Sequence, residues 1–233
     1  MLDFREVWGH TPQPMTVQVK ICGLTSADAI DAAVSAGASY GGLVFHPNSP
    51  RNLTLEQARS LADRMRGRLK IVALIVDMDD AGIETLINIV RPDFLQLHGS
   101  ESARRTAYIR GKFKIPVIKV LPVAEPSDLT CAAEYDDAAD MLMFDARPPK
   151  GAARPGGHGA AFDWKILDGR NFTKLWFLAG GLAADNVARA IQLSGADLVD
   201  VSSGVESAPG VKDPQRIRDF LLAAKTSMSK QDA

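Results

Sequence analysis

The sequence is short of cysteine, which excludes two ways of holding a small protein together. Cys22 and Cys131 are the only cysteines among 233 residues. Two thiols are too few for a disulfide scaffold or a structural zinc site. A bridge between them would need an oxidising compartment, which nothing in the sequence indicates. The fold is therefore expected to depend on a buried core, which a chain of this length can supply.

The sequence also lacks an excess of charge of either sign. It has 27 Lys and Arg against 28 Asp and Glu residues, a formal net charge of -1 and a pI near 6.4. Proteins that bind nucleic acid or acidic membranes depend on a basic surface, so we expect neither partner. A small anionic substrate needs only a local positive potential and is compatible with this balance.

Long hydrophobic runs are absent as well. No apolar stretch is long enough to span a bilayer. The N-terminal segment carries Asp3, Glu6, Trp8 and His10, and it lacks the basic start and apolar centre of a signal peptide. We therefore expect a cytoplasmic protein that does not bind a membrane.

Short β-rich segments alternate with helical segments along almost the whole chain. They are rich in Val, Ile, Leu and Phe with weak alternation, which is typical of strands buried on both faces. The predicted strands cover 16–21, 39–45, 70–76, 94–97, 117–121, 141–144, 175–178 and 198–201. The predicted helices cover 25–37, a segment that begins at Thr54, 80–90, 100–110, 127–132, 162–167, 184–193 and 214–224. Thr54 and Gln57 have the spacing of a capping box.

This alternation predicts a parallel sheet in an α/β protein. Eight units in about 210 residues fit a single-domain (β/α)8 TIM barrel, which we place at residues 16–226. Residues 1–15 are expected to form an N-terminal extension and residues 227–233 a polar C-terminal tail. The rival architecture is a doubly wound open sheet, which usually has fewer strands and a clear switch point.

In such a barrel the loops that follow the strands form the active face. Cys22 directly follows the first predicted strand, before Gly23 and a helix start whose dipole would favour a thiolate. Alternation places Lys20 on the same face of the strand, where it could lower the pKa of the thiol further. The plainer interpretation is that Cys22 is a small buried apolar residue.

Asp145 directly follows the apolar run of the sixth predicted strand, an unfavourable place for an unpaired carboxylate. To act as a general acid at neutral pH it needs a raised pKa, which apolar walls and partial burial can supply. Arg147, two residues further on, would instead lower that pKa. A capping role or a salt bridge would also explain Asp145, and the sequence leaves these alternatives open.

The loops after the last two predicted strands indicate an anion site. Gly180 and Gly181 precede a helix, and Ser202, Ser203 and Gly204 follow the eighth strand. Glycines let backbone N–H groups approach an oxyanion, and barrels often bind phosphate at this place. Tight turns alone would also account for the glycines.

Arg51 and His98 complete the set of candidate residues. Arg51 lies in a polar loop, where it could clamp a substrate carboxylate or be a solvated surface arginine. His98 follows the fourth strand and is expected to contribute to substrate binding, directly or through a neighbour. No companion ligand spacing supports a metal, so we expect no metal site.

Taken in order, these motifs resemble phosphoribosylanthranilate isomerase of tryptophan biosynthesis. The matching segments are 19–25, 42–51, 95–99, 144–145, 156–159 with 162–164, 178–182 and 200–206. Each is weak alone, but the ordered set extends through nearly the whole chain and is highly specific. The sequence departs from the family at His158, where a small hydroxyl residue is usual, and in residues 1–14, which have no counterpart.

The resemblance implies a cofactor-free isomerase, an intramolecular oxidoreductase that acts on N-(5-phosphoribosyl)anthranilate. It would form 1-(2-carboxyphenylamino)-1-deoxyribulose 5-phosphate by an Amadori rearrangement. Carried onto matching positions, Asp145 is the acid that opens the ribose ring and Cys22 the base that removes the C2′ proton. Arg51 would hold the anthranilate carboxylate, and the two glycine- and serine-containing loops would hold the phosphate. Small barrels of this sort are monomers or homodimers.

Two other functions stay open on the sequence alone. A related isomerase barrel of histidine biosynthesis uses two aspartates as acid and base, so Cys22 argues against it. A barrel that binds a phosphorylated ligand without turnover is the other, and the presence of Cys22, Asp145 and Arg51 together argues against it.

Overall fold

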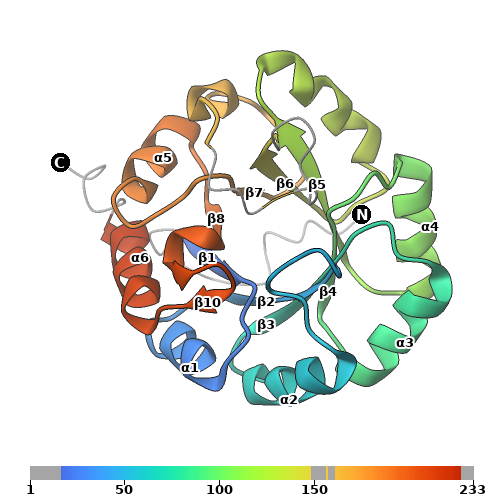
Figure 1. Ribbon diagram of the computed structural model, residues 1–233. Coiled ribbons are helices and arrows are strands. Elements are labelled where there is room, and N and C mark those ends of the chain that lie inside the picture. The colour runs from blue at the N-terminus through green and yellow to red at the C-terminus, as the bar shows by residue number, and fades with distance from the viewer. Residues whose placement is uncertain (1–16, 148–155, 157–160, 227–233) are drawn as a thin grey trace, which may run out of the picture.

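A closed barrel of eight parallel strands forms the centre of the computed structural model, which describes residues 17–147, 156 and 161–226. Each strand pairs with the next along the chain, and β1 pairs with β8 to close the barrel (Figure 1). The strands are β1 (Gln18–Cys22), β2 (Tyr40–Phe45), β3 (Lys70–Ile75), β4 (Phe94–Leu97), β5 (Val117–Val123), β6 (Met141–Ala146), β7 (Trp176–Leu178) and β8 (Leu198–Val201). The predicted barrel is confirmed, and the predicted extension and tail lie outside the described residues.

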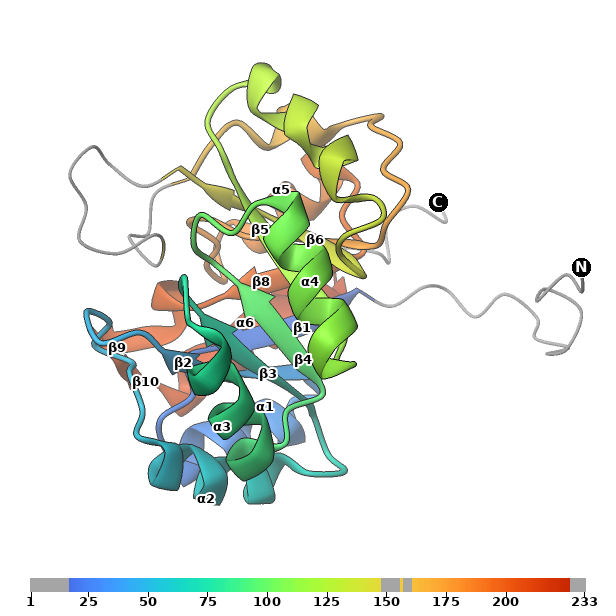
Figure 2. The ribbon, with the colours of Figure 1, turned by 90° about the vertical axis from the view of Figure 1, so that its right-hand side faces the viewer.

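Helices surround the barrel (Figures 1 and 2). They are α1 (Ala27–Ser35), α2 (Leu55–Met65), α3 (Asp80–Val90), α4 (Ala103–Phe113), η1 (Pro126–Tyr135), η2 (Trp164–Leu167), α5 (Val187–Ser194), η3 (Ser203–Val205) and α6 (Pro214–Thr226). The predicted capping box is present, because the Gln57 N–H donates to Thr54 Oγ1 at 3.2 Å and the Thr54 N–H donates to Gln57 Oε1 at 2.9 Å. None of the helices in the described ranges is long and apolar enough to cross a membrane.

The segments that follow β5 and β6 are 3₁₀ helices, whereas the sequence predicted ordinary helices there. At the two ends of η1, which begins at Pro126, the backbone N–H groups of Asp128 and Asp136 donate to the carbonyls three residues earlier, at 3.0 and 3.2 Å. That spacing matches the tighter i to i+3 winding. The predicted helices at 127–132 and 162–167 are therefore present as η1 and η2.

Apolar side chains pack in two shells, one on each side of the strands. The larger shell fills the space between the strands and the helices. The smaller shell forms the floor of the barrel, where Tyr40 and Phe177 meet edge to face with ring centroids 5.2 Å apart. Above this floor Lys20, Gln96 and Asp200 are all buried, beside a third, small apolar cluster that contains Val44 and Leu74. Because buried polar groups need partners, this layer is where a site is expected.

A small hairpin follows the last barrel strand, and the sequence did not predict it. It consists of β9 (Glu206–Ala208) and β10 (Val211–Lys212). Gly210, at its turn, has φ +83°, and a Cβ there would lie 2.5 Å from the carbonyl oxygen of Pro50. Only glycine therefore lets the hairpin pack this closely against the loop that follows β2.

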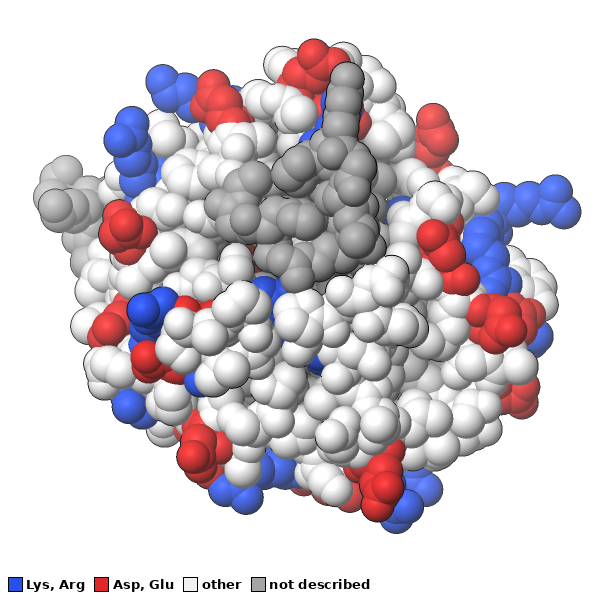
Figure 3. All heavy atoms as spheres, in the orientation of Figure 1, with Lys and Arg blue, Asp and Glu red and all other residues white. Residues whose placement is uncertain are grey.

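Charged side chains of both signs interleave around the rim of the molecule on the face shown in Figure 3. That face looks down onto the carboxyl ends of the barrel strands, in the orientation of Figure 1. Among the described residues this outer surface therefore offers no concentrated positive charge to a small anion, and we expect the positive potential to come from inside the barrel mouth.

Candidate active site

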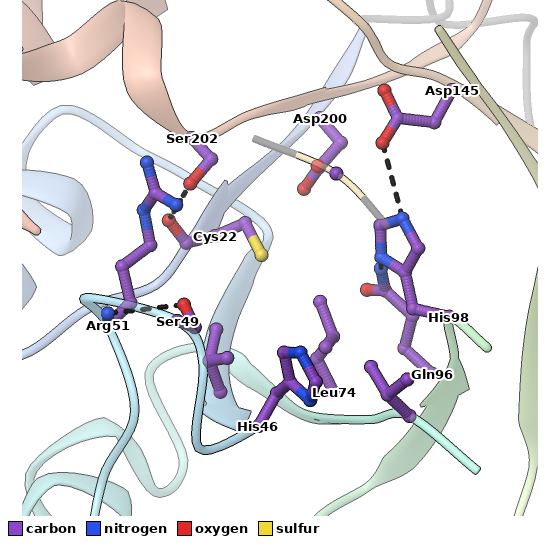
Figure 4. Close-up of a pocket in the computed structure, with 13 residues that line it drawn as sticks. Cys22, His46, Ser49, Arg51, Leu74, Gln96, His98, Asp145, Asp200 and Ser202 are labelled. Carbon is purple, nitrogen blue, oxygen red and sulfur yellow. Dashed lines mark hydrogen bonds and ion pairs between the residues drawn. The ribbon is translucent and has the colours of Figure 1, made fainter. Parts of the chain in front are cut away.

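A pocket opens inside the barrel at the carboxyl ends of the strands (Figure 4). It brings together five of the predicted site residues, namely Cys22, Arg51, His98, Asp145 and Ser202. Cys22 and Asp145 come from β1 and β6 and face the cavity from different sides (Figure 4). The thiol and the carboxyl group thus share one cavity, as a two-residue proton-transfer site requires.

Strand alternation explains why these side chains meet. In a β-strand, residues two apart point to the same face, and three strands carry a pair of polar or reactive residues at this spacing. The pairs are Lys20 and Cys22 on β1, Gln96 and His98 at the end of β4, and Asp200 and Ser202 at the end of β8. In each pair the residue with the smaller number lies deeper in the barrel, and the one two positions later lies at the mouth.

Cys22 is buried beside positive charge. Lys20 lies on the same face, as the sequence predicted, and its Nζ donates to Asp200 Oδ1 at 2.7 Å. Burial raises the pKa of the Cys22 thiol, whereas Lys20 and Lys212 lower it and Asp200 raises it, with a net rise. The sequence predicted that the helix dipole would favour a thiolate, but α1 begins only at Ala27 and burial is the largest influence on the pKa of Cys22, which it raises.

Lys20 itself keeps its charge in this setting. Burial lowers the pKa of the Lys20 ammonium, but the attraction of Asp200 and of Cys22 outweighs it, so the pKa is raised overall. A Cβ placed on Gly42 would lie 3.2 Å from both Cys22 Sγ and Lys20 Nζ. The absence of a side chain on Gly42 therefore leaves room for the sulfur and the ammonium to approach each other.

Asp145 is held by two neighbours and is free of Arg147. The backbone N–H of Ala146 donates to Asp145 Oδ1 at 2.8 Å, and His98 Nε2 lies 3.3 Å from Asp145 Oδ2. Arg147 turns away and pairs with Asp128. Arg147 therefore does not form the salt bridge with Asp145 that the sequence left open.

Arg51 is not the solvated surface residue that the sequence left open. It is buried, and its Nε and Nη2 donate to the two oxygens of Glu206 at 2.6 and 2.8 Å. Lys212 Nζ donates to the same carboxylate at 2.7 Å. Glu206 therefore fixes the orientation of the Arg51 guanidinium, and Arg51 lines the pocket. Gly23 is required beneath it, because a Cβ there would lie 2.4 Å from Arg51 Cδ.

The two predicted phosphate loops lie at the same rim but only Ser202 of them lines the pocket. Gly180 and Gly181 follow β7 with φ of +88° and +64°. A Cβ on Gly180 would lie 2.6 Å from the Ala146 nitrogen, and one on Gly204 would lie 2.0 Å from the Leu182 oxygen. Tight packing thus accounts by itself for the glycines at positions 180 and 204. Phosphate binding by the two loops stays a prediction.

Sequence reasoning missed several buried polar residues around the pocket. Gln96, Asp200, Glu206 and Lys212 are each less than a tenth exposed. The signal that could have found the first two is a polar residue two positions before a candidate residue at a strand end. Glu206 and Lys212 had no such signal, because the hairpin that places them was not predicted. His158 lies outside the described residues, and those residues contain no group of three or more His, Cys, Asp or Glu side chains placed to hold a metal ion.

Comparison with known proteins identifies the family. The sequence model of the N-(5′-phosphoribosyl)anthranilate isomerase family matches residues 19–223. The chain belongs to this family. A phosphoribosylanthranilate isomerase from Paramagnetospirillum magneticum is 53% identical over 211 residues, covering 91% of this chain and 98% of the relative.

Solved structures of the isomerase family share the fold. The enzyme from Thermotoga maritima has a TM-score of 0.81 and 34% identity, covering 90% of this chain and 99% of its own; the same organism's isomerase is described as dimeric. Another isomerase structure, with a TM-score of 0.78 and 32% identity over the same shares, holds reduced 1-(o-carboxyphenylamino)-1-deoxyribulose 5-phosphate. The resemblance read from the sequence motifs is confirmed.

Proposed function

We propose that this protein isomerises N-(5′-phosphoribosyl)anthranilate to 1-(2-carboxyphenylamino)-1-deoxyribulose 5-phosphate, an Amadori rearrangement of tryptophan biosynthesis. Membership of the isomerase family carries the activity. The observation that supports the mechanism is the single pocket in which Cys22 of β1 and Asp145 of β6 face each other across the cavity. One group can then act on each side of a bound ribose, where fixed orientation lowers the barrier.

Asp145 is the proposed general acid. It gives a proton to the ring oxygen of the ribose, the bond from C1′ to that oxygen breaks, and a Schiff base forms with the anthranilate nitrogen. Positive charge on this nitrogen acidifies the C2′ hydrogen. Cys22, as thiolate, takes that proton, and the enolamine that remains tautomerises to the ketone. C1′ is reduced and C2′ oxidised within one molecule, so the reaction needs no external redox cofactor.

Lys20 supports the proposed base. Burial raises the pKa of the Cys22 thiol, and the Lys20 ammonium lowers it more than Lys212 does. A thiolate formed next to Lys20 is therefore compensated by a charge that is already in place, since Lys20 stays protonated. Such preorganised charge requires no rearrangement when the proton moves.

The two ends of the substrate have separate proposed partners. Arg51 is fixed in place by Glu206 and lines the pocket, where it can take the anthranilate carboxylate. The backbone N–H groups and hydroxyls of the loops containing Gly180 and Gly181 and Ser202, Ser203 and Gly204 are the proposed phosphate site. His98 is proposed to act through Asp145, which it contacts.

The test generates the substrate in situ from anthranilate and phosphoribosyl pyrophosphate and follows the loss of its fluorescence. Cys22→Ser and Asp145→Asn should each lower kcat by about 10²–10⁴-fold with a modest change in KM, because each removes one proton-transfer group. Cys131→Ser is the matched control, since Cys131 lies outside the pocket and its thiol donates to a carbonyl that serine can also reach.

Well-folded wild-type protein that gives no acceleration would reject the proposed activity and favour a barrel that binds without turnover. Near-normal turnover in either variant would remove that residue from the mechanism. We also propose a cytoplasmic location and a monomeric or homodimeric state. Light scattering on the eluted protein decides the latter, and a larger assembly would contradict it.

A further inference from the structure

Gln96 is a fully buried amide that the mechanism above does not use. It projects from β4 into the barrel, directly below His98 (Figure 4). Its Nε2 lies 3.3 Å from His98 Nδ1 and 3.5 Å from Met143 Sδ. Its Oε1 is buried, faces the cavity and has no hydrogen-bond partner among the described residues.

These neighbours determine which way the amide points. A thioether sulfur only accepts hydrogen bonds, so the edge of the amide that faces Met143 must be the NH₂ group. The same NH₂ group faces His98 Nδ1, which then has to be the unprotonated ring nitrogen. The proton of the neutral imidazole is therefore on Nε2, the nitrogen that lies 3.3 Å from Asp145 Oδ2. The donor groups then point in one direction, from Gln96 Nε2 to His98 Nδ1 and from His98 Nε2 toward Asp145 Oδ2.

We propose that Gln96 is a positioning residue for the general acid, which it controls by fixing the ring proton of His98 on Nε2. The inference rests on the proposed role of Asp145. Once Asp145 has given its proton to the ribose ring oxygen, a carboxylate remains, and a hydrogen bond to a charged acceptor is stronger than one to a neutral acceptor. The Nε2–H of His98 therefore favours the state that follows proton transfer.

The opposite tautomer would work against the same step. With the proton on Nδ1, the lone pair of Nε2 would face the carboxylate oxygen, which favours retention of the proton by Asp145. The second carboxylate oxygen is already occupied by the Ala146 N–H at 2.8 Å, so the group cannot rotate away without losing that bond. Control of the tautomer by Gln96 thus becomes control of how readily Asp145 releases its proton.

The decisive measurement is the ¹⁵N NMR spectrum of the His98 ring, because the two nitrogens resonate differently when protonated and when bare. We expect a bare Nδ1 and a protonated Nε2 in the wild-type protein near neutral pH. Gln96→Glu keeps the shape but replaces the donor with an acceptor, so Nδ1 should become protonated. Gln96→Met removes the donor and should give a mixture of tautomers. Circular dichroism shows whether each variant is folded.

Measurement of kcat provides a second, independent test of the role of Gln96. Gln96→Glu should lower kcat by about 10–100-fold, as expected for a group that orients a reacting residue from behind. His98→Gln replaces the ring with an amide that has no tautomers. In that background Gln96→Glu should cost much less, and the coupling between the two sites is what a double-mutant cycle measures.

Two results would overturn the inference. One is a wild-type spectrum with the proton on Nδ1, and the other is equal loss of kcat from Gln96→Glu with His98 present or replaced. The first result does not depend on the proposed function, because the tautomer is observed without substrate, whereas the second is measured only in active enzyme. Wild-type protein that lacks isomerase activity would instead reject the function and leave the spectrum to decide the hydrogen-bond chain alone.

Discussion

At the residue scale, the notable feature is a buried thiol supplied with positive charge from within the barrel. Lys20 reaches Cys22 because both occupy inward positions of β1 and because Gly42 leaves the space between them open. Asp200 neutralises the ammonium on its other side at 2.7 Å. Burial raises the pKa of the thiol most, and Lys20 and Asp200 shift it in opposite directions, so the effect of each charge can be tested by removing it separately.

Replacement of Lys20 tests that balance. Lys20→Met removes the charge that lowers the pKa of Cys22, so the pKa should rise further and the thiolate fraction should fall. The acidic limb of the kcat/KM profile and the pH dependence of alkylation by iodoacetamide should both move to higher pH, by about 1–3 pH units.

The matched control adds Asp200→Asn to the same variant. Asp200 raises the pKa of Cys22, so its neutralisation should bring both profiles part of the way back. If the single variant keeps the wild-type midpoint in both measurements, Lys20 does not set the acidity of the thiol.

At the scale of elements, the barrel and its strands were predictable, and the connections were less so. Runs of apolar residues at regular intervals specify buried parallel strands, and cap residues such as Thr54 mark the helix starts. The 3₁₀ winding of η1 was not predictable from the pattern, because apolar spacing over ten residues does not distinguish it from an α-helix.

The candidate site was predictable where its residues end strands and not where they belong to the hairpin. Cys22, His98 and Asp145 follow apolar runs, so their shared pocket follows from the barrel itself. Glu206 fixes Arg51 only because β9 and β10 fold back over the loop after β2, a contact between segments 155 residues apart in sequence. No local pattern carries that information.

The hairpin predicts a stability effect that depends on pH. Glu206→Gln leaves Arg51 and Lys212 buried without their shared counter-charge, which should lower the free energy of unfolding by about 3–5 kcal/mol at pH 7. Burial raises the pKa of Glu206, but hydrogen bonds and charge from Arg51 and Lys212 lower it overall from its ordinary value of 4.5. The stabilisation is therefore present above pH 4.5 and is lost as the pH falls below that value.

Urea unfolding of wild type and variant from pH 7 to pH 3 measures this. The difference between them should shrink as the pH falls, because the wild-type carboxyl becomes protonated. Asp31→Asn serves as the control, since Asp31 forms an exposed ion pair with Arg64 and should hardly change the free energy of unfolding. A difference that stays constant down to pH 3 would mean that the charge of Glu206 contributes nothing.

At the scale of the whole molecule, the first and last elements of the barrel close it together. β1 pairs with β8, and α6 packs against α1, α5, β1 and η3. Lys225 at the end of α6 donates to the carbonyl of Ala36, just after α1, at 2.8 Å. We call this closure, formed by β1, β8, α1 and α6, the seam. Cys22 and Asp200 lie on the two strands that meet at this seam. Disruption of the seam is therefore expected to disrupt the pocket as well.

Phe220 on α6 provides the test of this dependence. Its side chain is fully buried at the seam, so Phe220→Ala should lower the free energy of unfolding by about 3–5 kcal/mol. Leu222, on the same helix but 66% exposed, is the control, and Leu222→Ala should have little effect. Urea unfolding should show circular dichroism, tryptophan fluorescence and isomerase activity of the Phe220 variant falling together at a lower urea concentration than in the wild type. If activity persisted after part of the helical signal had gone, α6 would be an appendage to the barrel, because loss of the seam would then leave the β1–β8 side of the pocket intact.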